Sequence, residues 1–233
     1  ALNANTTGDR HVAIGANALD ANTTGRFNTA VGFNSGTGVT TGEANTFVGD
    51  SSGALTTTSS NNTAVGQSAL YSNTTGASNT VLGALALVYA TTASNNTAVG
   101  KSALEATTTG DQNTAVGSLA ADALTTGAQN VAVGYAALST AITGIGNTAV
   151  GRAALNENTG SSNTAVGQDA LEANTSGGTN TAVGAQALTA NTTANNNTAV
   201  GYFALPANTT GDLNVAVGTQ ALESNTVGDR SVA

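Results

Sequence analysis

Cysteine and tryptophan are absent from this chain of 233 residues, and aromatic residues make up only 3% of it. Without cysteine, the chain can form neither disulfides nor thiolate metal sites. The scarcity of aromatic side chains excludes a conventional core of large residues. We therefore expect a protein that gains its stability from repetition and association.

Charge is also scarce, with 13 acidic residues, five basic residues and a formal net charge of −8. Such a chain has no basic stripe for nucleic acid, and an anionic membrane surface would repel it. No apolar run approaches the roughly 20 residues that span a bilayer. We expect no nucleic-acid partner and no membrane insertion within this sequence.

Residues suited to catalysis or metal binding are few. His11 is the only histidine, so the many serine and threonine hydroxyls have no other histidine to activate them. No carboxylate pair recurs, no aspartate-rich calcium motif is present, and the glycines do not form a dinucleotide-binding fingerprint. We predict no catalytic residue, no metal site and no cofactor, and hence a protein that is not an enzyme.

What the chain does contain is a repeat marked by glycines. Eleven of the twelve intervals between them are 17 residues long, and the interval from Gly151 to Gly167 is 16. The full unit, seen in residues 62–78, reads NTAVGQSALYSNTTGAS, and the pentapeptide NTAVG occurs eight times. A fixed short period is typical of a solenoid, in which each coil contacts only its neighbours. The glycines are Gly15, Gly32, Gly49, Gly66, Gly83, Gly100, Gly117, Gly134, Gly151, Gly167, Gly184, Gly201 and Gly218.

The pattern of the unit predicts a short strand followed by turns. Alternation along the strand would place Thr29 and Val31 on one face and Ala30 on the other. We assign the valine face to the coil's own core, and the next glycine to a corner that needs positive φ or a close backbone approach. Asn-Thr-Thr-Gly is typical of an outer turn. The Ala-Leu pair should form an extended or turn segment with its leucine pointing inward, as at Leu19, Leu70, Leu104, Leu155, Leu188 and Leu222.

These elements predict an all-β fold, a parallel β-solenoid of about 14 coils in which residues 1–233 form a single repetitive segment. At a strand spacing of about 4.8 Å, the rod would be roughly 65 Å long. Because the sequence begins and ends within a repeat, we expect it to be either part of a longer fibre or a mature fragment whose ends are covered by other chains. Asparagine ladders can bond amide to amide along the axis, here through Asn28, Asn62, Asn79, Asn96, Asn113 and Asn147.

Several units depart from the pattern. The 16-residue interval lacks one threonine in its outer turn, residues 158–160, where a deletion would spare the strand register. Gly36, Gly53 and Ala121 stand where most other units have leucine. We expect the coils that contain them to have thinner cores.

Self-association is expected because one valine and one leucine per coil make a narrow core for the entropy cost of ordering 17 residues. A ladder of alanine suits the close approach of another backbone, so we predict a homo-oligomer, most simply a trimer, packed through alanine. The alternative is that alanine faces the chain's own core and threonine faces water. The ladder comprises Ala13, Ala30, Ala64, Ala98, Ala115, Ala149, Ala165, Ala182, Ala199 and Ala216.

The unit Asn-Thr-Ala-Val-Gly-x-x-Ala-Leu resembles the head repeats of YadA-like trimeric autotransporter adhesins. Residues 11–15, HVAIG, are the nearest match to the Ser-Val-Ala-Ile-Gly core of that family. The unit is also similar to the NTAVG-type repeats of tail-fibre-like proteins of phages and bacteria. The YadA-like unit is shorter and lacks the Asn-Thr-Thr-Gly turn. The resemblance covers essentially the whole chain and implies a trimeric surface fibre, a left-handed coil and an adhesive or spacer role.

We therefore expect a structural segment of an extracellular, cell-surface or virion-surface fibre. The alternative is a dedicated binding surface, either an adhesin head that contacts host, matrix or glycan, or an ice-binding threonine ladder. The threonines for ice binding would be the outer-turn pairs at 6–7, 23–24, 40–41, 74–75, 108–109 and 209–210, although only one threonine of each adjacent pair could face outward. Glycosylation is a minor hypothesis, at the sequons of Asn5, Asn22, Asn73, Asn174, Asn191 and Asn208.

Overall fold

The computed structural model describes residues 1–233, and it is all-β with no helix. The chain divides into two compact units, Ala1–Val116 with strands β1–β7 and Gly117–Ala233 with strands β8–β13. Each strand is three residues long. The strands are β1 Val12–Ile14, β2 Thr29–Val31, β3 Thr46–Val48, β4 Thr63–Val65, β5 Thr80–Leu82, β6 Thr97–Val99, β7 Thr114–Val116, β8 Val131–Val133, β9 Thr148–Val150, β10 Thr164–Val166, β11 Thr181–Val183, β12 Thr198–Val200 and β13 Val215–Val217.

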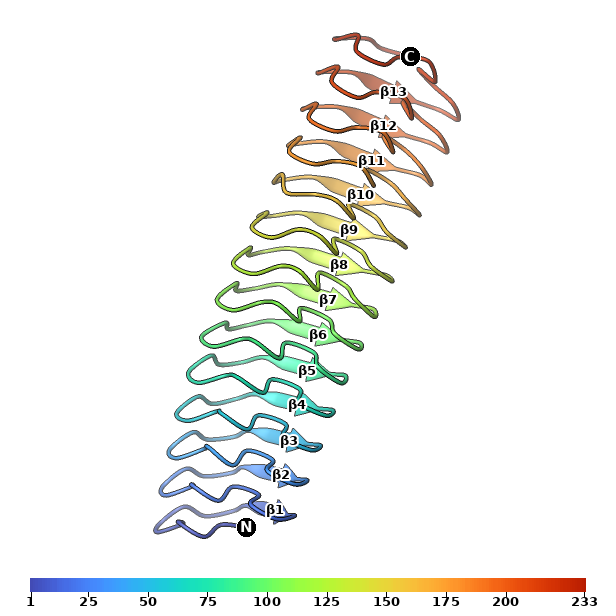
Figure 1. Ribbon diagram of the computed structural model, residues 1–233. Helices are drawn as coiled ribbons and strands as arrows, with labels where there is room; N and C mark the ends of the chain where they lie inside the picture. The colour runs from blue at the N-terminus through green and yellow to red at the C-terminus, as the bar shows by residue number, and fades with distance from the viewer. The chain divides into compact units, whose positions relative to one another are not determined.

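Within each unit, consecutive strands pair in parallel and in register, so that alanine lies beside alanine in most pairs. Figure 1 shows the coils of each unit stacked one on the next, with the strands along one side and turns completing each coil. The strands are β-branched at their outer positions, which suits short extended segments. The prediction of a parallel β-solenoid with a 17-residue period is confirmed.

The 16-residue interval leaves the sheet undisturbed. Thr148 pairs with Thr164 and Ala149 with Ala165, as in the regular coils. In a regular outer turn, three consecutive amides from Thr23 onward donate to the carbonyl of Thr40; in the short turn, two amides donate to the carbonyl of Thr175. Some turns of regular length also make only two such bonds, as from Thr74 and Thr75 to Thr91. The missing residue therefore leaves the bonding of the turn within its usual range and preserves the strand register, as predicted.

The strand residue that faces the core is alanine rather than valine. Ala30, Ala64 and Ala98 are fully buried, whereas the threonine and valine on either side of each alanine are half-buried or exposed. Our assignment of valine to the coil's own core was therefore wrong, and so was the assignment of alanine to a partner chain. The alternative, with alanine inward and threonine toward water, is correct.

Leucine gives the physical reason for this orientation. The leucine of the Ala-Leu pair is fully buried in the interior coils, as at Leu19, Leu70 and Leu104, and half-buried at Leu222 in the last coil. In most coils this leucine is combined with an alanine at the inward strand position, and larger residues there would have to fit into an interior that the leucine already fills in part. The coil of β5 shows that one valine can be accommodated, because Val81 and Leu87 are both fully buried.

The coil that lacks leucine at Gly53 supports this account, because Phe47 replaces the strand alanine there and is fully buried. A Cβ placed on Gly36 would lie 2.9 Å from Cδ2 of Phe47 and 3.2 Å from Cδ2 of Leu19. A Cβ on Gly53 would lie 2.8 Å from Cγ of Phe47. The phenylalanine ring thus fills the space of two absent leucines, and the predicted thinning of these cores was wrong.

A similar exchange occurs in the coil of Ala121. Leu124 stands three residues later, where most coils have the asparagine of the outer turn, and it is fully buried. Val39 occupies the same position in the coil of Gly36 and is also fully buried. Loss of the inward leucine is therefore offset by an apolar residue at a second inward position of the same coil.

The corner glycine after each strand has both properties predicted for it. Gly66 has a φ of +136°, and a Cβ there would lie 2.5 Å from the carbonyl oxygen of Gly83 in the next coil. A φ of +136° lies outside the left-handed region near +55° that residues with side chains adopt in this chain, and so close an approach of a carbonyl oxygen leaves no space for a side chain. The spacing of the coils at this corner therefore requires glycine.

The Ala-Leu segment is a turn in which residues other than glycine adopt positive φ. Ser68 and Leu70 have φ values of 52° and 54°. The amide of Leu70 donates to the carbonyl of Ala86 (3.0 Å) in the next coil. Left-handed leucine is unfavourable by itself, so burial of the leucine side chain must stabilise this conformation.

Candidate functional surfaces

The structure contains no pocket, and no three or more histidine, aspartate or glutamate side chains converge as metal ligands. No helix is present that could cross a membrane. Arg26 pairs with Asp9 (3.0 Å), and Arg152 pairs with Asp169 (2.8 Å). The features with functional potential are therefore ladders and faces that repeat from coil to coil.

The asparagine before each strand forms a buried ladder, which we call the strand-entry ladder. The backbone N–H of Asn62 donates to Oδ1 of Asn45 (3.0 Å), and Nδ2 of Asn62 donates to the same oxygen (3.2 Å) and to the carbonyl of Gly76 (3.0 Å). The predicted amide-to-amide bonding is therefore confirmed. The ladder comprises Asn28, Asn45, Asn62, Asn79, Asn96 and Asn113 in the first unit and Asn130, Asn147, Asn163, Asn180, Asn197 and Asn214 in the second.

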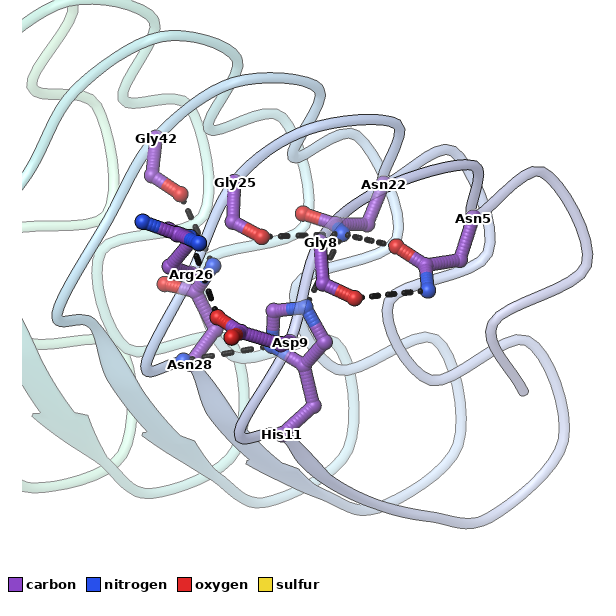
Figure 2. A network of polar contacts seen from close by, with 9 residues as sticks. All are labelled: Asn5, Gly8, Asp9, His11, Asn22, Gly25, Arg26, Asn28 and Gly42. Atoms are coloured by element: carbon purple, nitrogen blue, oxygen red, sulfur yellow. Dashed lines mark hydrogen bonds and ion pairs between the residues drawn. The ribbon is translucent and has the colours of Figure 1, made fainter.

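His11 occupies the first position of the strand-entry ladder. Figure 2 shows its ring between Asn22 and Asn28, beside the Asp9–Arg26 ion pair. Its Nδ1 accepts a hydrogen bond from the backbone N–H of Asn28 (3.3 Å), and its Nε2 lies 3.2 Å from Nδ2 of Asn22. A ring nitrogen thus replaces an asparagine oxygen, a structural role indicated in the sequence by the alignment of His11 with Asn28 one period later.

The asparagine of the outer turn forms a second ladder, the turn ladder. Nδ2 of Asn191 donates to Oδ1 of Asn174 (2.8 Å) and to the carbonyl of Ala194 (3.1 Å). Asn208 repeats this arrangement with Asn191. The turn ladder comprises Asn5, Asn22, Asn73, Asn158, Asn174, Asn191, Asn208 and Asn225.

The turn ladder contains the six sequons considered above, and its burial limits glycosylation there; three further Asn-Asn-Thr sequons begin at the exposed residues Asn61, Asn95 and Asn196, outside this ladder. Asn22, Asn73, Asn174, Asn191 and Asn208 are fully buried, and their Nδ2 atoms are hydrogen-bond donors inside the coil. A glycan at these atoms has no space in the folded chain. Asn5 is exposed and is the one sequon of the six where a glycan could be accommodated.

The turn ladder is interrupted where other residues replace asparagine. The buried Oδ1 atoms of Asn22 and Asn73 have no hydrogen-bond partner. One period later stand Val39 and Ala90, neither of which has a side-chain donor. An unpaired buried acceptor is destabilising, so each gap is a weak point of its coil.

The threonines of the outer turn are used by the fold. Oγ1 of Thr74 donates to the carbonyl of Thr91 (2.9 Å), and Oγ1 of Thr23 donates to the carbonyl of Thr40 (3.1 Å). The second threonine of each pair, such as Thr24 or Thr75, is exposed. The first hydroxyl of a pair thus binds the next coil, which makes the turn pairs poor candidates for an ice-binding array.

The outward side of the sheet is a different surface, which we call the Thr–Val face. It consists of the first and third residues of strands β1–β13 and contains no charged residue. Its third residues are half-buried in six strands, as at Val31 and Val65, and exposed in the other seven, up to 60% at Ile14 and Val217. Its threonine hydroxyls make no hydrogen bond within the chain; these are Thr29, Thr46, Thr63, Thr80, Thr97, Thr114, Thr148, Thr164, Thr181 and Thr198.

One acidic cluster lies in the second unit, at Glu157, Asp169 and Glu172 beside Arg152. Burial raises the pKa of Glu172, and repulsion by Asp169 and Glu157 raises it further, while Arg152 acts in the opposite direction. The carboxylate of Glu172 is therefore less favourable in the folded chain than in water. The effect is local to two neighbouring coils.

Comparison with known proteins adds no assignment. No protein-family model matches the chain, and no curated protein matches it. The repeat and its surfaces are therefore the basis for the function proposed below.

Proposed function

We propose that the chain is a structural segment of an extracellular, cell-surface or virion-surface filament, a stiff rod that displays, spaces or attaches a group at its end. The observation that carries this proposal is the continuity of bonding from coil to coil in each unit. Strand pairs, two asparagine ladders and the outer-turn hydroxyls all connect a coil to its neighbours. Bending such a stack would strain many bonds at once, so the role is mechanical rather than catalytic.

Small-angle X-ray scattering tests the rod directly. A solenoid of about 14 coils continued through both units would have a largest dimension of roughly 65 Å, with a cross-section that stays constant along its length. A compact particle, with the two units folded back on each other, would contradict the proposal. Scattering at several concentrations separates the length of one rod from end-to-end association.

Self-association, most simply as a trimer of left-handed coils, is part of the same proposal. It is supported by the resemblance to trimeric adhesin heads and by the narrowness of each core, and no longer by the alanine ladder. Native mass spectrometry should give three times the mass of the 22.4 kDa chain. A monomer would remove the trimer from the proposal and leave the single rod.

Adhesion to a host, a matrix or a glycan is the second candidate. Aromatic residues that directly follow the corner glycine favour it, since Phe33, Tyr135 and Tyr202 are more than half exposed. Exposed aromatic rings are frequent anchors of binding surfaces. Beads coated with the chain should adhere to cells or matrix, and Tyr135→Ala with Tyr202→Ala should reduce adhesion; equal adhesion by both forms would favour a pure spacer.

A further inference from the structure

The Thr–Val face differs from ordinary binding surfaces in carrying the same two groups on nearly every coil. Thr63, Thr80 and Thr97 pair in register, as do Val65, Leu82 and Val99. A surface that presents the same groups on every coil has no distinctive arrangement of groups with which to recognise an irregular partner. Its natural ligand is one that is itself periodic on the same scale.

We infer that the Thr–Val face binds crystalline water, that is, the surface of ice. Threonines of adjacent coils are about 4.8 Å apart, and the first and third residues of a strand are about 6.6 Å apart. The result within each unit is a two-dimensional grid of hydroxyl and methyl groups. The repeat along the grid exceeds the distance between hydrogen-bonded oxygen atoms and is close to a lattice repeat of ice, the distance between equivalent oxygen atoms.

The chemistry of the grid suits a layer of ordered water. Each strand threonine presents a hydroxyl with no partner in the chain, so it can donate to one water and accept from others. The methyl groups of threonine and valine between the hydroxyls cannot compete for those waters. Charged side chains, which would organise water around themselves, are absent from this face although the chain carries a net charge of −8.

Two other periodic ligands fit the face less well. A second copy of the chain would bury the row of free threonine hydroxyls, and an unpaired buried hydroxyl is costly. A crystalline polysaccharide is usually bound by stacking on aromatic rings. The one aromatic residue in the strands, Phe47, faces the core. Ice is therefore the ligand that the hydroxyls, the methyls and the missing charge favour together.

The test is thermal hysteresis, the gap between the melting and freezing points of an ice crystal in a solution of the whole chain. We expect the wild-type chain to produce a gap that serum albumin at equal concentration does not. Thr63→Lys with Thr97→Lys should abolish most of it, because two lysines on alternate coils disrupt the grid. The matched control, Thr75→Lys with Thr109→Lys, adds the same charge at exposed outer-turn threonines and should retain it.

Circular dichroism of each variant establishes that the solenoid is intact. If the lysine pair unfolds, Thr63→Ala with Thr97→Ala removes the hydroxyls with less disturbance and should reduce the gap. The inference is overturned if the wild-type chain gives no gap, or if the turn variant loses it and the strand variants do not. It is also overturned if the wild-type chain is an oligomer that the strand lysines dissociate, because a second copy would then cover the face. Each of these results is independent of the scattering test of the rod.

Discussion

Single buried amides hold neighbouring coils together, and the gaps in the turn ladder show what each contributes. Asn191 is followed three residues later by Ala194 and still donates both to Asn174 and to the carbonyl of Ala194. Ala90 is followed in the same way by Ala93, and the acceptor of Asn73 in the preceding coil is unpaired. An asparagine at position 90 could therefore make the same two hydrogen bonds that Asn191 makes in its own coil.

Ala90→Asn should accordingly stabilise the first unit. The new amide would donate to Oδ1 of Asn73 and to the carbonyl of Ala93, and one net hydrogen bond contributes about 1 kcal/mol. Thermal unfolding followed by circular dichroism should show a higher midpoint. Ala21→Asn, at a half-buried position of another coil, is the control and should not raise the midpoint; a lower midpoint for Ala90→Asn would contradict the ladder account.

Glu172 provides a residue-scale prediction about pH. Folding raises its pKa, mainly by burial and then by repulsion from Asp169. The folded state therefore holds this proton more tightly than the unfolded state, so the stabilising contribution is present below the unfolded pKa. It is lost as the pH rises through the raised folded pKa.

Glu172→Gln should therefore be more stable than the wild-type chain at neutral pH, and the difference should shrink under acid conditions in which the glutamate is protonated. Chemical denaturation at a series of pH values measures this. Glu223→Gln, which also follows a leucine of the repeat and is exposed, should show no such trend. A stability difference that grows toward acid pH would mean that the sign of the shift is wrong.

The corner glycines give a third prediction, which separates backbone conformation from crowding. Gly66→Ala should disrupt its corner, because the new Cβ meets the carbonyl of Gly83 in the next coil. Gly218 has nearly the same φ, of +131°, but a Cβ there has nothing within 4 Å. Gly218→Ala should therefore carry only the cost of the backbone conformation, and Gly66→Ala should cost clearly more. Equal losses in a denaturation experiment would show that crowding at the corner does not matter.

At the scale of one coil, the sequence was sufficient to predict the position of the strand but not which of its two faces lies inward. Period-two alternation correctly placed threonine and valine on one face and alanine on the other. Which face is inward depends on how the strand residue shares the interior with the leucine of its coil; alanine is the usual inward residue, and Val81 is inward in β5 beside a buried Leu87. Hydrophobicity alone favours valine for the core, so the local pattern gives the wrong answer. One coil contains sequence evidence for the correct orientation. There a large residue, Phe47, stands at the usual alanine position and a small one, Gly53, at the usual leucine position, which indicates that the two positions share one space.

That exchange leads to a prediction about the coil as a unit. Phe47→Ala should destabilise the first unit by about 3–5 kcal/mol, since it leaves a cavity where no leucine is present to fill it. Adding Gly36→Leu and Gly53→Leu to the same chain should recover much of the loss by restoring the usual Ala-and-Leu coil. Gly53→Leu alone should destabilise, because its Cβ would overlap the phenylalanine ring. Additive losses in the triple variant would contradict the idea that these residues share one space.

For each unit as a whole, the period predicted the architecture, while the functional surfaces depended on features that the period does not contain. The glycine spacing was enough to predict parallel coils and ladders of like residues. It could not show that the hydroxyls of the turn threonines donate hydrogen bonds to the next coil, or that those of the strand threonines make none within the chain, because both sets of threonines repeat with the same interval. Hydrogen bonding, and not periodicity, distinguishes a surface available to a ligand from one that holds the stack together.

If each coil depends only on its neighbours, one complete coil should be removable from within a unit. Deleting residues 80–96 would join Asn79 to Thr97 and place β6 directly on β4, with Ala98 beside Ala64 and the strand-entry ladder unbroken. The first unit should still fold, with a slightly lower unfolding midpoint because one interface between coils is lost. Deleting residues 80–88 instead removes about half a coil, which puts turn residues opposite strands and should prevent folding of the stack beyond β4. Circular dichroism and limited proteolysis of the two deletions measure the difference, and equal damage by both would contradict nearest-neighbour stacking.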